Sequence, residues 1–237
     1  MTNSPAPNPA AVSAERSRLI DYFKRLFAIV AGLAITEAVK RVYPSPSQEI
    51  TWPSIWIFGT FLVTIIPIFH GGDRSLDLKY LNSNQITGGR RVAYIWDVYM
   101  LVITAILFVC IAEAIPHADP KKSHLYSVAE SSMFYKLMAV MLVFDVMVLA
   151  VDFLKTPGAQ RADLSSYLVW IPANLILAGL CYGAGSSIPD AATLVSAADV
   201  VIAWGSINFQ ELTFYLFTAA VVRMFADYWA GRTFLFP

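Results

Sequence analysis

Long apolar stretches separated by short polar segments dominate the chain. They fall near residues 22–41, 53–70, 93–115, 133–154, 166–184 and 209–229. A helix needs roughly 20 mostly apolar residues to cross the hydrocarbon layer of a bilayer, and each stretch comes close to that length. Runs such as LVITAILFVCIA (residues 101–112) lack the alternation of apolar and polar positions that a barrel strand requires. The pattern therefore predicts an all-α fold, a polytopic membrane bundle of six transmembrane helices.

The first stretch is the weakest of the six. Its uninterrupted apolar core, Leu26 to Thr36, is only 11 residues long. Lys24 and Arg25 precede this core and Lys40 and Arg41 follow it, so their long side chains could reach the two membrane interfaces and extend the span. A helix that lies along the membrane surface is the alternative.

Basic residues are distributed unevenly between the two sets of loops. The set that includes both chain ends holds eleven Lys and Arg residues, and the other set holds four. Basic residues collect in the cytoplasmic loops of membrane proteins. We therefore expect both termini in the cytoplasm and a multi-pass protein of the plasma (inner) membrane. Residues 1–18, rich in Pro, Ala, Ser and Asn, are expected to form a disordered cytoplasmic tail, and residues 19–237 the transmembrane domain.

The predicted fifth loop, residues 187–208, has an unusual composition. It contains no basic residue and carries an apolar run from Leu194 to Trp204. This run is too short to cross the bilayer, so an interfacial or re-entrant helix is predicted.

Composition supports a membrane environment and excludes one class of partner. The chain is 57% hydrophobic and 14% charged, whereas soluble domains carry about 25% charged residues. Seventeen basic and seventeen acidic residues cancel, so nothing indicates a nucleic-acid partner. Small residues recur every fourth position at Ala28, Gly32 and Thr36, and again at Gly179 and Gly183. Such spacing permits close helix contacts, either within the chain or with a second copy or another membrane protein.

Several ionisable residues inside the predicted spans form a polar layer in the cytoplasmic half of the bundle. They are Asp97, Asp145, Asp152, Arg223 and Asp227, with His70 and Asp73 at the rim of this layer. A charge at the bilayer centre is unfavourable by roughly 2.5–3.5 kcal/mol, so Arg223 must face the interior and find a carboxylate. The predicted partner is Asp145 or Asp97. Asp227, four residues further along the same helix, is the local competitor.

Four carboxylates against one arginine leave a surplus of acid. Buried acids of this kind must be protonated, hydrated or bound to a cation. The surplus indicates a water-filled vestibule or a path for protons or cations through the layer. The alternative is that the charges only fix helix register, as buried ion pairs often do.

The sequence Ile68-Phe69-His70-Gly71-Gly72-Asp73 marks an abrupt change from apolar to polar character. Paired glycines after an apolar run predict that the helix stops there. The alternative is catalytic, with His70 as a general base oriented by Asp73 or Asp97.

No motif assigns a catalytic residue, a metal ligand or a cofactor. His117, Asp119 and His124 lack a third ligand at a recognisable spacing, and no phosphate loop, HExxH or GxSxG motif is present. Three functions stay open. The acid surplus favours a small ion- or proton-linked channel or transporter; the others are a membrane-anchored subunit or sensor acting through a protein partner, and an intramembrane enzyme acting on a lipid or quinone.

Overall fold

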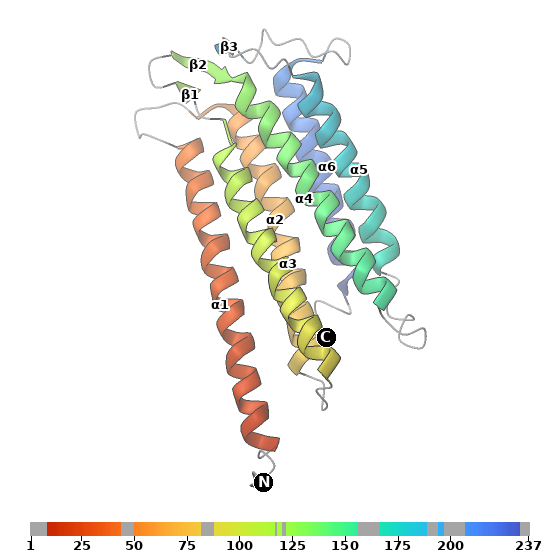
Figure 1. The fold of residues 1–237 in the computed structure, drawn as a ribbon. Helices are drawn as coiled ribbons and strands as arrows, with labels where there is room; N and C mark the ends of the chain where they lie inside the picture. The colour runs from red at the N-terminus through yellow and green to blue at the C-terminus, as the bar shows by residue number, and fades with distance from the viewer. Residues whose placement is uncertain are drawn as a thin grey trace.

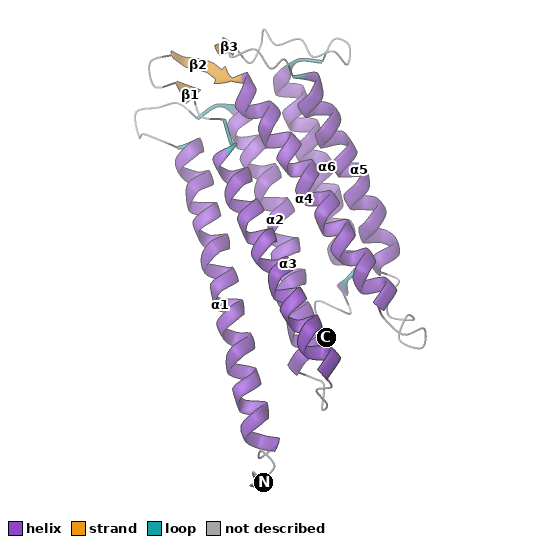
Figure 2. Ribbon diagram, viewed as in Figure 1, coloured by secondary structure: helices purple, strands orange, loops and turns teal. Residues whose placement is uncertain are grey.

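The computed structural model describes residues 9–43, 50–81, 88–116, 118–119, 122–155, 166–188, 194–196 and 207–232. In this part of the chain, six α-helices run alternately up and down as a bundle (Figure 1; Figure 2). They are α1 (Pro9–Val42), α2 (Trp52–Leu76), α3 (Gly88–Glu113), α4 (Val128–Lys155), α5 (Tyr167–Ser187) and α6 (Phe209–Ala230). The prediction of a helical bundle is therefore confirmed for the described residues. In Figure 1, α1 begins and α6 ends at the same end of the bundle.

A small antiparallel sheet covers the opposite end of the bundle and was not predicted. Its strands are β1 (Ala118–Asp119), β2 (Lys122–Ser127) and β3 (Leu194–Ser196), in the order β1-β2-β3. Residues 194–196 belong to the run for which an interfacial or re-entrant helix was expected. They pair with β2 instead. The residues on either side of them, 189–193 and 197–206, lie outside the described part.

Four of the described helices are long and apolar enough to cross a membrane. The segments concerned are Trp52–Leu76, Tyr94–Glu113, Glu130–Leu154 and Tyr167–Ser187. Helix α6 is not among them because Glu211, Arg223 and Asp227 lower its hydropathy, and α1 begins with a charged stretch. Six crossings, cytoplasmic termini and the plasma (inner) membrane stay predictions.

Most of the buried apolar core lies in the half of the bundle nearest the strands, although Ile20, Leu76 and Trp170 are buried in the other half. Its side chains come from the start of α2, α4 and α6 and from the end of α3 and α5, for example Phe61, Phe108, Phe134 and Leu142. Large apolar side chains also point outward along the helices, such as Trp229 at 70% exposure. Apolar groups on the outside of the bundle suit a lipid surrounding, where they meet acyl chains rather than water.

Helix α1 begins earlier than the sequence suggested. Residues 9–18 were expected to belong to a disordered tail, but they form the first turns of a 34-residue helix. The reason is local, since Ala, Glu and Arg in this segment favour helix even where apolar periodicity is missing. Residues 1–8 lie outside the described part.

Helix α2 does not stop at the paired glycines. It continues through Gly71 and Gly72 to Leu76, and a π-helical segment, η1 (Asp77–Leu81), extends it further. Gly72 serves helix packing instead: a Cβ atom there would lie 2.9 Å from Leu101 of α3. The expected helix end was therefore wrong: the helix continues, and Gly72 lies close to α3, whereas a Cβ atom at Gly71 would meet nothing within 4 Å.

Small residues contribute to helix packing at a position that the sequence pattern missed. Ala28, Gly32 and Gly179 are exposed, whereas Gly185 lies against α4, where a Cβ atom would approach the Ser132 carbonyl oxygen to 2.9 Å. The Ser132 hydroxyl also donates a hydrogen bond of 2.7 Å to the Gly185 carbonyl. The contact between α4 and α5 thus requires the absence of a side chain at residue 185.

Substitution Gly185→Ala is expected to destabilise the protein by about 1–3 kcal/mol, because the added methyl group meets backbone that cannot move aside alone. Gly179→Ala on the same helix is the matched control; it has open space and gains helix propensity. Thermal unfolding of both variants in detergent measures the difference. Equal melting temperatures would contradict a close contact at Gly185.

Candidate functional site

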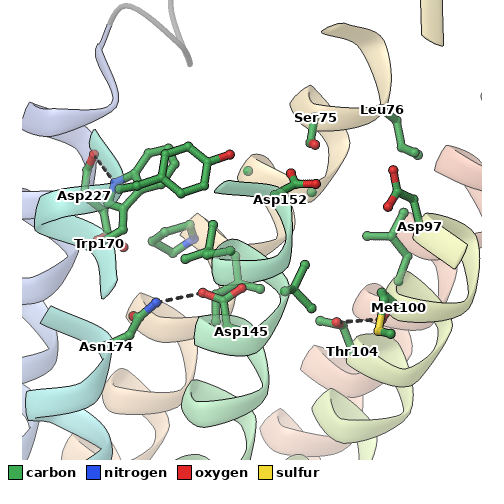
Figure 3. Close-up of a pocket in the computed structure, with 18 of the residues that line it drawn as sticks. Ser75, Leu76, Asp97, Met100, Thr104, Asp145, Asp152, Trp170, Asn174 and Asp227 are labelled. Atoms are coloured by element: carbon green, nitrogen blue, oxygen red, sulfur yellow. Dashed lines mark hydrogen bonds between the residues drawn. The ribbon is translucent and has the colours of Figure 1, made fainter. Parts of the chain in front are cut away.

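A cavity of about 120 Å³ lies in the half of the bundle away from the strands. We call it the acidic cavity, because Asp97 of α3, Asp145 and Asp152 of α4 and Asp227 of α6 line it. Figure 3 shows these four acids, which come from three helices, around one space. Arg223 also lines the cavity, so the structure brings together all five residues of the layer expected from sequence.

Arg223 forms the centre of the hydrogen-bond network at the cavity wall. Its side chain is only 5% exposed, and its Nη2 atom lies 2.8 Å from Asp227 Oδ2. Its Nε atom donates to Asn174 Oδ1 at 2.7 Å, and Nη1 donates to the Thr64 carbonyl oxygen at 3.3 Å. Asn174 in turn donates through Nδ2 to Asp145 Oδ2 at 2.7 Å (Figure 3). One guanidinium therefore connects α2, α5 and α6, and Asn174 extends the connection to α4.

The partner expected for Arg223 was wrong. Asp145 is reached only through Asn174, and the direct ion pair is formed with Asp227, the competitor on the same helix. A neighbour at i+4 is already in place when the helix forms, so it needs no particular helix packing. Asp97, the other expected partner, contacts Lys79 and Tyr80 instead.

Lys79 links the two acids at the end of the cavity. Its Nζ atom lies 2.6 Å from Asp152 Oδ1 and 3.3 Å from Asp97 Oδ2. The Tyr80 hydroxyl donates to the same Asp97 oxygen at 2.7 Å. Burial, followed by this hydrogen bond, raises the pKa of the Tyr80 phenol well above its ordinary value, so the phenol remains a donor at neutral pH. The sequence pattern did not indicate Lys79 as part of the site, because the helix was expected to end at the paired glycines, Gly71 and Gly72.

The two residues expected at the rim do not line the cavity. Asp73 faces α1 and lies 3.2 Å from Lys24 Nζ, which also contacts Asp77 at 2.9 Å. The His70 ring lies beside Tyr228 of α6, with 6.1 Å between ring centroids. The hypothesis that Asp73 or Asp97 orients His70 as a base stays a prediction.

The charges on the cavity wall do not balance. Among the described lining residues are four carboxylates and two cations, Lys79 and Arg223. Asp227 Oδ1 is buried and has no hydrogen-bond partner in the part of the chain that the structure describes. An unsatisfied buried acceptor is unfavourable by about 1–3 kcal/mol, and by more for a charged group. No group of three or more His, Cys, Asp or Glu side chains that could hold a metal ion occurs among the described residues.

Apolar outer surfaces and four helices long and apolar enough to cross a membrane make the chain compatible with an integral membrane protein. No protein family, curated protein or solved structure matches the chain. Any more specific function must therefore be argued from the acidic cavity.

Substitution Asn174→Ala is expected to lower the stability of the bundle by about 2 kcal/mol, because both Arg223 and Asp145 lose a buried partner. Gln210→Ala removes an exposed amide at the start of α6 and is the matched control. Chemical or thermal unfolding in detergent would detect the loss. A variant as stable as the control would mean that water replaces Asn174 without penalty.

Proposed function

We propose that the protein is a transporter that moves protons or monovalent cations through the acidic cavity. The observation that supports this proposal most strongly is the surplus of acid, since four carboxylates share one cavity with two cations. Desolvation and mutual repulsion both favour uptake of a proton or a cation by such a cluster. Ionisable groups inside membrane proteins commonly line ion and proton pathways.

The arrangement along the bundle supports a path that begins at Lys79. Asp97 and Asp152 flank Lys79 at that end, and Asp145 lies seven residues before Asp152 on α4. At 1.5 Å per residue this places Asp145 about 10 Å deeper. An ion that enters near Lys79 would therefore meet carboxylates at two successive depths.

The strand half of the bundle favours a transporter over an open channel. Phe61, Phe108 and Leu142 are fully buried there and fill the space beyond the cavity. A continuous water path does not pass through closely packed apolar side chains. The proposal therefore includes a second conformation in which the helices separate on the strand side, as alternating access requires.

A structural role for the same charges is the competing explanation. Arg223 and Lys79 each have a carboxylate partner, and such pairs can hold helices in register without any transport. Under that explanation the protein would act as a membrane subunit through a protein partner. Flux and stability measurements on one set of variants distinguish transport from this structural role.

Proton flux into proteoliposomes is expected for the wild-type protein and is expected to fall about tenfold or more in Asp145→Asn. The amide keeps an oxygen that can accept from Asn174 but cannot take up a proton or attract a cation, and about 1.4 kcal/mol already corresponds to a tenfold change.

Glu113→Gln is the control for this experiment, since Glu113 is an exposed acid at the strand end of α3. It should retain wild-type flux. Absence of flux in all three proteins, together with a lower melting temperature for Asp145→Asn alone, would assign the charges to structure and reject transport.

A further inference from the structure

We propose that the acidic cavity binds a small protonated amine, with the ammonium group at the Asp227 carboxylate and the hydrocarbon part against the apolar wall. This inference rests on the proposed transport function and names the substrate class of the same site.

The first argument is an acceptor that lacks a donor. The Asp227 side chain is 7% exposed, its Oδ2 atom contacts Arg223, and its Oδ1 atom is buried with no partner among the described residues. Two further hydrogen bonds of Arg223 go to Asn174 Oδ1 and to the Thr64 carbonyl. A ligand that brings an N–H group satisfies this oxygen, whereas a quaternary ammonium ion has no such hydrogen.

The second argument is charge. The described lining residues carry two more carboxylates than cations, so a cationic ligand is favoured over a neutral one. Lys79 shows that the cavity accommodates an alkylammonium group, since its Nζ atom lies within 3.3 Å of both Asp97 and Asp152.

The third argument is the character of the wall. Leu101, Val148, Leu149 and Trp170 line the cavity beside the acids. A metal cation needs several oxygen ligands around it, and the described residues contain no cluster of three or more metal-binding side chains. An amine makes use of both parts of the wall, with its ammonium at the carboxylates and its carbon atoms against the apolar and aromatic groups.

The size of the cavity limits the ligand. Its volume is about 120 Å³, and an engineered cavity of about 150 Å³ in another protein holds benzene. A ligand of roughly five or six non-hydrogen atoms is therefore expected. Isobutylamine meets this limit, and isobutanol has nearly the same shape without the charge.

The test is equilibrium binding of radiolabelled isobutylamine to the full chain in lipid nanodiscs. Saturable binding is expected, with no competition from isobutanol or from equimolar K⁺. Asp227→Asn is expected to weaken binding about tenfold or more, because it removes the charge. Val148→Phe is expected to abolish binding by filling the cavity, and it leaves every charge in place. Glu113→Gln should bind like the wild type.

Three results would overturn the inference: no saturable binding by the wild type, binding that survives both Asp227→Asn and Val148→Phe, or displacement by equimolar K⁺. If Asp227→Asn does not fold, the binding measurement on Val148→Phe alone tests the inference. Failure here differs from failure of transport. If Asp145→Asn abolishes proton flux but the wild type does not bind the amine, the proposed transport function stands and the amine is rejected. If the wild type binds the amine but shows no flux, the amine site stands and transport is rejected.

Discussion

The buried guanidinium of Arg223 imposes the strongest constraint on the cavity half of the bundle. An arginine stays charged under all ordinary conditions, so its donors need acceptors wherever it is enclosed. Those acceptors come from Thr64 on α2, Asn174 on α5 and Asp227 on α6. Three helices must therefore hold fixed distances from one another, and Asn174 passes the same requirement to Asp145 on α4. The cavity exists where these helices are held by polar contacts rather than by close apolar packing.

The two halves of the bundle are thus held together by different kinds of contact. Phe108, Phe134 and their apolar neighbours fill most of the strand half, where buried polar side chains such as Thr60 and Ser132 carry no charge, whereas the other half carries the acids and the cavity. Extension of α2 beyond its glycines completes the second half, because η1 places Lys79 between Asp97 and Asp152. Transport and amine binding both require this division: a ligand needs a charged site on one side and a barrier on the other.

The membrane-like fold and the members of the charged layer could be read from the sequence for simple reasons. Apolar stretches of span length predict helices, and a rise of 1.5 Å per residue converts position along a helix into depth. Depth alone placed Asp97, Asp145, Asp152, Arg223 and Asp227 in one layer, and all five line one cavity. Local turns were harder, since Gly71 and Gly72 are equally consistent with a helix end and with a close helix contact.

What the sequence by itself determined is therefore the set of helices and the position of the five layer residues along them, because both follow from residues close together along the chain. The tertiary structure alone decided which groups on different helices meet: Arg223 with Asn174, Lys79 with Asp152, and Asp73 with Lys24. These pairings depend on the rotation of each helix about its axis and on which helices are neighbours. Packing across the whole bundle sets both quantities, and no local pattern of residues contains them.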